Sequence, residues 1–197
     1  QEFTLAASKS LDTREIMDTL SHVITSEIRT GQVYILLADD KFYKAQYSST
    51  PLARTAFQIR ADSPCLLSLK HGEPHVILKE FRSGPLASAL WAEEQRLFER
   101  LNLDCIVPIK DQDEIVGLVF LCGREKSVSY SFTELSFLSV ACSIASIALK
   151  NAVLYEQMFR EARIDPLTGV NNYRSFVERV GQEFERCGQE PLALIYV

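Results

Sequence analysis

The side chains best suited to nucleophilic or metal chemistry are five cysteines and three histidines, which are scattered along the 197-residue chain. The cysteines are odd in number and none forms a Cys-x-x-Cys pair, so their spacing indicates neither a zinc site nor a dithiol motif. Cys105 and Cys122 lie inside apolar stretches, and no basic residue stands directly beside either to stabilise a thiolate. We therefore expect buried, reduced thiols that act as small hydrophobic side chains, and no metal bound to this chain.

The composition is that of a folded protein, with 47% hydrophobic and 24% charged residues. The net charge of −5 and the absence of a long basic run give no electrostatic support for binding to nucleic acid. Residues 1–10 lack the apolar stretch of a signal sequence. The longest uncharged run, 135–149, has 15 residues, fewer than the roughly 20 that a membrane span needs. We expect a cytoplasmic location and no membrane contact in this segment.

Apolar periodicity and turn signals predict alternating helices and strands before residue 130. Asp12 followed by Glu15 is typical of a helix start with a capping box, and apolar residues at helical spacing continue that helix to Thr30-Gly31. Two more helices are expected from Pro64 and over 91–101. The predicted strands cover 33–38, 42–47, 57–60, 75–78, 105–109 and 115–122, the last two forming a hairpin. This order predicts an α+β domain around a mostly antiparallel sheet flanked by helices.

A single helix is predicted over 132–164, far longer than the average of about 11–12 residues. It carries small and aromatic residues at alternating spacings of four and three, the spacing of a coiled-coil seam. The same residues would also serve a helix packed on its own sheet, and one face could pack inward while another meets a partner. We expect a homodimer through this helix, with a seam formed by Ala141, Ala145, Ala148, Ala152, Tyr155, Phe159 and Ala162.

Several segments in the same order resemble the GAF domain family. Gly72-Glu73-Pro74 leading into His75-Val76-Ile77 is similar to the family's helix, Gly-x-Pro, strand passage. Val107-Pro108-Ile109 followed by 115–119 resembles its central hairpin, and Phe132-Thr133-Glu134-Leu135 resembles the start of its closing helix. The resemblance covers residues 3–155 and implies a GAF-like, PAS-related sensory domain over 1–155. Its long C-terminal signalling helix would continue over 132–164 as a coiled-coil linker.

GAF domains hold small ligands between the sheet and the loop-rich side, so the resemblance implies an unknown small ligand here. The cyclic-nucleotide signature of the family is missing from the sequence. A bilin would need a thiol such as Cys65 or Cys105, and haem would need a histidine such as His75, which on a strand is more often an ordinary half-buried residue. Aromatic and other side chains in or facing the irregular stretch 79–101 are the candidate pocket lining, with plain core packing as the alternative: Phe57, Cys65, His75, Phe81, Trp91 and Cys105.

Residues 165–174 resemble the opening motif of GGDEF domains, which make cyclic di-GMP from two GTP molecules. The matching residues are Asp165, Leu167, Thr168, Gly169, Asn172 and Arg174, while Val170 and Tyr173 depart from the family pattern. The alternative is an ordinary linker, in which Pro166 ends one helix and Asn172 caps the next over 173–187. The GGDEF resemblance, in contrast, implies that residues 165–197 are the truncated start of a GGDEF-like domain. The signature loop is not in this sequence, so we expect no catalytic residue and no cofactor in this chain.

Together the two resemblances imply the regulatory, sensory GAF domain of a bacterial diguanylate cyclase. The complete parent protein would need magnesium and GTP, with two output domains facing each other. One alternative is a non-catalytic signalling adaptor with a degenerate GGDEF domain, a reading that Tyr173 favours slightly. A stand-alone GAF binding module is the other alternative.

Overall fold

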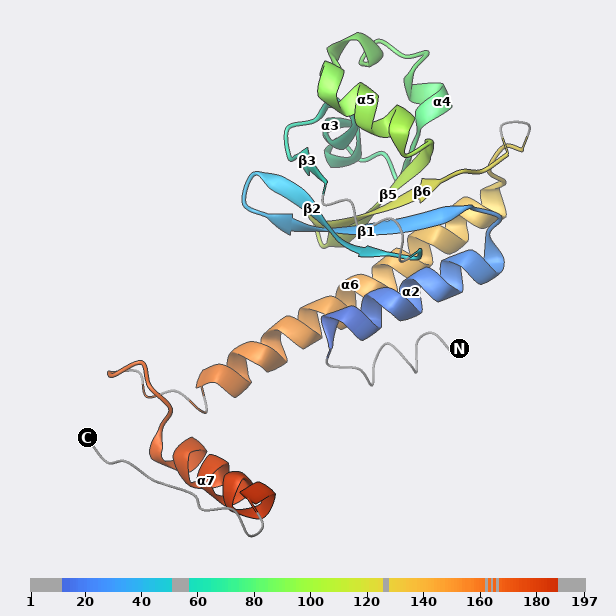
Figure 1. Cartoon of the computed structure of the whole chain (residues 1–197). Coiled ribbons are helices and arrows are strands. Elements are labelled where there is room, and N and C mark those ends of the chain that lie inside the picture. Colours follow the sequence, from blue (N-terminus) through green and yellow to red (C-terminus); the bar gives the residue numbers. More distant parts are fainter. Residues whose placement is uncertain are drawn as a thin grey trace. The chain divides into compact units, whose positions relative to one another are not determined.

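A computed structural model describes residues 12–50, 57–125, 128–161, 163, 165 and 167–187. The chain divides into two compact units, Gln1–Ala152 and Val153–Val197. The first unit is an α+β domain, and the second contains the helix α7 (Tyr173–Cys187). Figure 1 labels most of the helices and strands.

Six strands form one antiparallel sheet in the first unit, as the sequence predicts. Their order across the sheet is β3-β2-β1-β6-β5-β4, so β1 and β6 lie at its centre. The strands are β1 (Gln32–Asp39), β2 (Phe42–Ser48), β3 (Gln58–Arg60), β4 (Val76–Ile77), β5 (Leu103–Asp111) and β6 (Glu114–Cys122).

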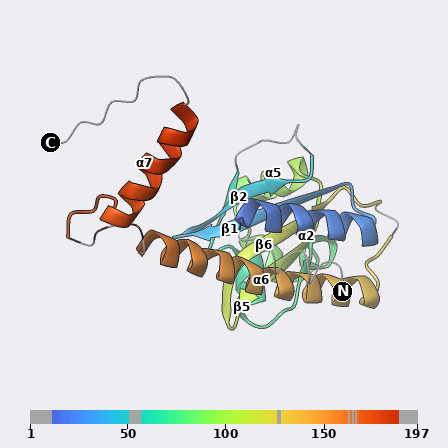
Figure 2. The same ribbon diagram turned by 90° about the horizontal axis from the view of Figure 1, so that it is seen from below.

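Helices cover both faces of the sheet (Figure 1). The helices α2 (Thr13–Glu27) and α6 (Phe132–Glu161) lie on one face, as Figure 2 also shows. On the other face lie α3 (Pro64–Lys70), α4 (Leu78–Phe81), α5 (Ala92–Arg100) and a short 3-10 helix, η2 (Ala87–Ala89). Because successive strand side chains point to opposite faces, Val33 and Ile35 join the core under α2 and α6, while Tyr34 and Leu36 join the core under α3 and α5.

The helix and strand starts agree with the sequence more closely than the ends do. Asp12 caps α2, its Oδ1 accepting the Arg14 amide at 2.8 Å, but the helix ends at Glu27 and not at Thr30. Ile28 is already extended and buried, because the chain turns there into β1. The strand predicted over 75–78 is reduced to Val76–Ile77, since Leu78 begins α4.

The β5–β6 hairpin accommodates Pro108 and Gly117, although proline and glycine usually weaken a strand. Pro108 pairs with Leu118 of β6, whereas β4 reaches only as far as Ile106 and Cys105, so no neighbour on that side needs an amide from Pro108. Gly117 lies where β6 passes β1, and a Cβ there would stand 2.8 Å from the Leu36 carbonyl oxygen. The strands approach this closely only because residue 117 has no side chain.

The long helix α6 is continuous, but its alanines do not form a surface seam. Ala141, Ala145, Ala148 and Ala152 are each at most 5% exposed and belong to the core under α2 and α6. The predicted seam is therefore wrong for these four positions, because the chain's own sheet covers the face that they share. Tyr155 is exposed, and the side chain of Phe159 and all of Ala162 lie outside the described residues.

By length and composition α6 could cross a membrane, with a mean hydropathy of 1.8 over an 18-residue window within Phe132–Met158. However, 44% of that window is buried inside the protein, and the core helix of a globular domain has the same composition. The expectation of no membrane contact stays a prediction.

Replacing Gly117 with alanine tests the close approach of β6 to β1. We expect Gly117→Ala to lower the free energy of unfolding by about 1–3 kcal/mol, because the added methyl group must push the strands apart. Chemical denaturation followed by circular dichroism measures this. Gly181→Ala on α7 is the matched control, since nothing lies within 4 Å of its added Cβ. Equal stability of Gly117→Ala and the wild type would contradict the proposed crowding.

Candidate functional site

A cavity of about 580 Å³ lies at the β4–β5 end of the sheet. Four segments form its wall: β4 with α4, the end of α5, the start of β5, and the segment that leads from β6 to α6. Ile77, Val128 and Tyr130 provide most of its apolar surface, the buried Leu78, Phe98 and Leu103 lie behind it, and Lys79, Arg82 and other charged residues surround them. A mixture of apolar surface and a few polar groups is typical of small-molecule sites.

Arg124, just after β6, forms hydrogen bonds with several segments of this wall. Its guanidinium forms two hydrogen bonds with Glu134, of 2.9 and 3.1 Å, in the first turn of α6. The same group donates to the carbonyl oxygens of Val128 and Ser129 at 3.1 and 3.2 Å. Its backbone amide donates to Asp104 at 2.7 Å. Arg124 therefore connects the start of β5, the cavity wall and the start of α6.

This ion pair is shielded from water. The Arg124 side chain is only 5% exposed, and that of Glu134 is 21% exposed. The hydrogen bonds from Arg124 lower the pKa of the Glu134 carboxyl, assisted by those from Ser131. Charged, bidentate hydrogen bonds in such a setting are stronger and more directional than neutral ones.

Tyr130 provides a polar group that the fold itself leaves unused. The Arg124 guanidinium lies 4.2 Å from the centre of its ring. The Tyr130 hydroxyl is buried, and no hydrogen-bond partner for it exists among the described residues. Burial raises the pKa of Tyr130, so the hydroxyl keeps its proton. The hydroxyl lies close to Cys105, and the Tyr130 ring packs against the core under α2 and α6.

The six pocket residues expected from the sequence do not come together. Phe57 and Cys65 are buried in the core under α3 and α5, where Phe57 stacks on Phe120 at 6.1 Å. Phe81 packs partly against that core, and His75 is half-buried. None of the six lines the 580 Å³ cavity. For Phe57 and Cys65 the plain packing role applies.

Two of the six lie elsewhere altogether. Cys105 points into the opposite core, under α2 and α6, so its assignment to the same pocket as Phe57 is wrong. Trp91 is 39% exposed and occupies the position just before α5, with the Arg60 guanidinium 4.8 Å from its ring centre.

The described cysteines are buried thiols, as the sequence predicts. Cys65, Cys105, Cys122 and Cys142 are buried and unbonded. Burial raises the pKa of Cys65, Cys122 and Cys142 to about 12, with smaller contributions from Glu94 at Cys65 and Asp104 at Cys122. Within the described ranges, no three His, Cys, Asp or Glu side chains are grouped so as to hold a metal ion.

Sequence reasoning missed Arg124 and Tyr130, although one signal was available. Ser131 and Glu134 form a capping box at the start of α6: the Ser131 amide donates to Glu134 at 2.8 Å and the Glu134 amide to Ser131 at 3.2 Å. That spacing is readable in the sequence. The buried partner of Glu134 is not, because the contact depends on how the segment after β6 folds back.

Glu94 is a second polar group buried beside the core under α3 and α5. It is 6% exposed, and its Oε2 accepts a 3.0 Å hydrogen bond from the fully buried Ser63 hydroxyl. Its other oxygen has no partner among the described residues. Burial raises the pKa of Glu94 to about 7, only partly offset by the bond from Ser63.

The 165–172 segment of the second unit is a compact loop held by its own polar residues. Asp165 Oδ1 accepts the amides of Leu167 and Thr168 at 3.0 and 2.9 Å, and the Thr168 hydroxyl at 2.9 Å. Gly169 has a φ of +71°, which glycine adopts without strain. Asn172 accepts the Ser175 amide at 3.0 Å and so caps α7, as expected. Leu167 is 93% exposed, and the Arg174 side chain lies outside the described residues.

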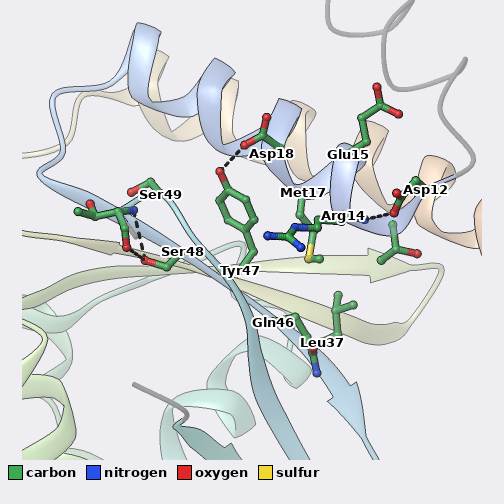
Figure 3. A pocket seen from close by; sticks show the side chains of 12 residues that line it. Asp12, Arg14, Glu15, Met17, Asp18, Leu37, Gln46, Tyr47, Ser48 and Ser49 are labelled. Atoms are coloured by element: carbon green, nitrogen blue, oxygen red, sulfur yellow. Dashed lines mark hydrogen bonds between the residues drawn. The ribbon is translucent and has the colours of Figure 1, made fainter. Parts of the chain in front are cut away.

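A larger groove of about 1050 Å³ runs between α2 and the β1–β2 edge (Figure 3). In Figure 3 the Tyr47 side chain reaches from β2 to Asp18 of α2, and its hydroxyl donates a 2.6 Å hydrogen bond. Its lining includes Asp12 and Thr50, and each of these two residues is followed or preceded in the chain by residues outside the described ranges. We therefore assign no site to it.

The fold is that of GAF domains. A GAF domain/HD domain protein from Geobacter sulfurreducens is similar over 75% of this chain and 98% of its own, with 21% identity and a TM-score of 0.61. The GAF domain of a two-component sensor histidine kinase from Bacillus halodurans matches 75% of this chain and 100% of its own, at 16% identity and a TM-score of 0.59. A methyl-accepting chemotaxis protein fragment matches 78% and 98%, at 15% identity and a TM-score of 0.62. No protein-family model and no curated protein matches the sequence.

The titration of Glu94 should make stability depend on pH. Its raised pKa favours the protonated carboxyl in the folded state, so this contribution is complete below about pH 4.5 and is lost as the pH rises through about 7. We expect Glu94→Gln to exceed the wild type in unfolding free energy at pH 8 by about 1–3 kcal/mol, and to differ much less at pH 5. Urea denaturation at both pH values measures this.

Glu93→Gln is the matched control, because Glu93 is the exposed neighbour on the same first turn of α5. It should leave the pH dependence unchanged. The account fails if Glu94→Gln and the wild type lose stability in parallel as the pH rises.

Proposed function

We propose that this chain is the sensory GAF domain of a diguanylate cyclase-type signalling protein, relaying a bound cue through α6 to a GGDEF output domain. One observation carries the proposal: Arg124 forms part of the cavity wall and also holds the first turn of α6 through Glu134. The GAF fold and the GGDEF-like motif that begins at Asp165 support the two ends of this relay.

The proposed cue is a small organic molecule that binds in the 580 Å³ cavity. Ile77, Val128 and the ring of Tyr130, which are not buried, would contact its apolar part. Cations such as Lys79 and Arg82 are balanced by Glu80, Glu99 and other carboxylates around the cavity. An uncharged or zwitterionic ligand fits this balance better than a polyanion does.

The relay requires that the ligand favours one arrangement of the segment between β6 and α6. A molecule bound against Tyr130 and Ser129 would contact the segment that Arg124 holds. Any change in the Arg124–Glu134 geometry would be passed directly to the first turn of α6. In the proposed dimer, a small rotation of this helix re-aims whatever follows Asp165.

The proposed output is synthesis of cyclic di-GMP from GTP with magnesium, in the cytoplasm of a bacterium. It rests on the motif residues Asp165, Thr168, Gly169 and Asn172. This chain would supply the regulatory part and would not itself hold GTP or magnesium. We propose neither nucleic acid nor a membrane as a partner.

The second candidate is a non-catalytic adaptor with a degenerate output domain. The loop geometry favours it to some extent, because Asp165, Gly169 and Asn172 all have local structural roles that require no catalysis. Tyr173, which replaces a usual arginine of the family motif, is 82% exposed. A stand-alone binding module is the remaining alternative.

The decisive test is the activity of the gene product that includes the residues encoded after Val197. Incubated with GTP and Mg²⁺, it should release cyclic di-GMP, detected by chromatography and mass spectrometry. The 197-residue chain alone is the control and should release none. If the longer product consumes no GTP, or lacks the Gly-Gly-Asp/Glu-Glu-Phe loop, the cyclase proposal fails and the adaptor replaces it.

A further inference from the structure

Glu94 connects two helices on the face of the sheet opposite α2 and α6. It lies in the first turn of α5, and its Oε2 accepts a 3.0 Å hydrogen bond from the hydroxyl of Ser63. Ser63 occupies the position that caps α3, yet its hydroxyl makes no capping bond to that helix. It donates to Glu94 instead, so this one bond links the start of α5 to the start of α3.

The carboxyl of Glu94 is shielded from water but incompletely bonded. Glu94 is 6% exposed, Ser63 is fully buried, and Oε1 of Glu94 has no hydrogen-bond partner among the described residues. An unpaired oxygen costs a neutral carboxyl much less than it costs a carboxylate, because a buried charge loses far more solvation. The packing of α5 against α3 therefore favours the protonated carboxyl.

The charged groups around Glu94 partly cancel one another. Asp62, in the turn before α3, disfavours a negative charge on Glu94, whereas Arg60 of β3 favours it. Arg60 is also bonded to both carboxylate oxygens of Asp62 at 2.9 Å. Cys65 of α3 stays neutral, since burial raises its pKa to about 12, and Glu93 on α5 itself is exposed. Burial has the largest influence, and it raises the pKa of Glu94 to about 7.

We propose that this domain senses protons through Glu94, whose protonated carboxyl holds the first turn of α5 against α3. When the proton passes to solvent, the carboxylate is more stable in water than in its buried position, so the first turn of α5 moves outward. Because the folded-state pKa is raised, the packed arrangement is complete below about pH 4.5 and is lost as the pH rises through about 7. This transition lies within the physiological range of pH.

The other end of α5 belongs to the cavity wall. Phe98 and Glu99 of α5, and Asn102 just after it, line the 580 Å³ cavity. Leu97 and Phe98 are buried, so they anchor this end of the helix while the first turn moves. Proton sensing does not rest on the proposed function, because it needs neither a ligand nor an output domain. In the proposed ligand-binding domain, the two inputs would share α5.

Amide hydrogen exchange of the wild-type chain at pH 5 and pH 8, corrected for the intrinsic rate at each pH, tests the movement. We expect amides 95–98, whose hydrogen bonds close the first turn of α5, to exchange roughly tenfold faster at pH 8 after this correction. Amides of β1 should keep their protection at both pH values. A carboxyl that titrates without any local movement would leave 95–98 unchanged.

Glu94→Gln removes the titration and keeps the bond to Ser63, because the amide oxygen can accept it. In this variant amides 95–98 should show the same protection at both pH values. Glu93→Gln is the matched control, since it removes an exposed carboxyl from the same turn, and it should behave like the wild type. Circular dichroism verifies that both variants are folded.

Trp91 provides a second readout, because it is the only tryptophan of the chain and lies just before α5, beside Arg60. Its fluorescence should show a transition with pH that Glu94→Gln abolishes. Ser63→Ala should move the midpoint to higher pH, since the lost hydrogen bond favours the carboxylate. Asp62→Asn should move it to lower pH, since a repelling charge is removed.

Three results would overturn the proposal. The first is equal protection of amides 95–98 at both pH values in the wild type. The second is a fluorescence transition that Glu94→Gln retains, which would assign the titration to another group. The third is faster exchange at pH 8 throughout the domain, including β1, which would indicate a general loss of stability. All of these measurements are made without GTP, so their failure leaves the cyclase proposal standing, and a product without cyclase activity leaves proton sensing standing.

Discussion

Arg124 connects the parts of the first unit that the proposed signalling depends on. Its backbone amide donates to Asp104 at the start of β5, and its buried guanidinium donates to the carbonyl oxygens of Val128 and Ser129 and to Glu134 of α6. Removing one partner of such a pair leaves the other charge buried, which costs far more than the loss of a surface ion pair. The geometry of the cavity wall and the start of the long helix are therefore coupled.

The second constraint is the size of the residues where elements approach closely. Gly117 lets β6 pass against the Leu36 carbonyl, and Ala141 and Ala145 let α6 lie close to the sheet. Small residues fill the inner face of α6, and large apolar residues such as Val140 and Ile147 remain exposed on it.

Much of the fold could be predicted from the sequence because local patterns determine it. Asp12 and Asn172 cap helices as expected, and the β5–β6 hairpin forms around Pro108 and Gly117. The alanine spacing in α6 was also real, but periodicity shows only which side chains share a face. It does not show whether the chain's own sheet or a second copy covers that face, and here the sheet covers it.

The cavity was beyond sequence reasoning for a similar reason. Its lining comes from four separate segments, and the bonds of Arg124 to Asp104 and Glu134 span 20 and 10 residues. Phe57 was expected to face the irregular stretch 79–101 as part of a pocket, but it packs in the core under α3 and α5. The unused hydroxyl of Tyr130 becomes visible only when its surroundings are known.

The most direct measurement is amide hydrogen exchange along α6 in Arg124→Met. If Arg124 holds the helix to the cavity wall, amides at 136–140 should exchange roughly tenfold faster or more than in the wild type, because charged hydrogen bonds contribute about 1.5–3 kcal/mol. Amides of β1 should keep their protection, which shows that the domain is still folded. Unchanged protection at 136–140 would contradict the account, since α6 would then be held independently of the cavity.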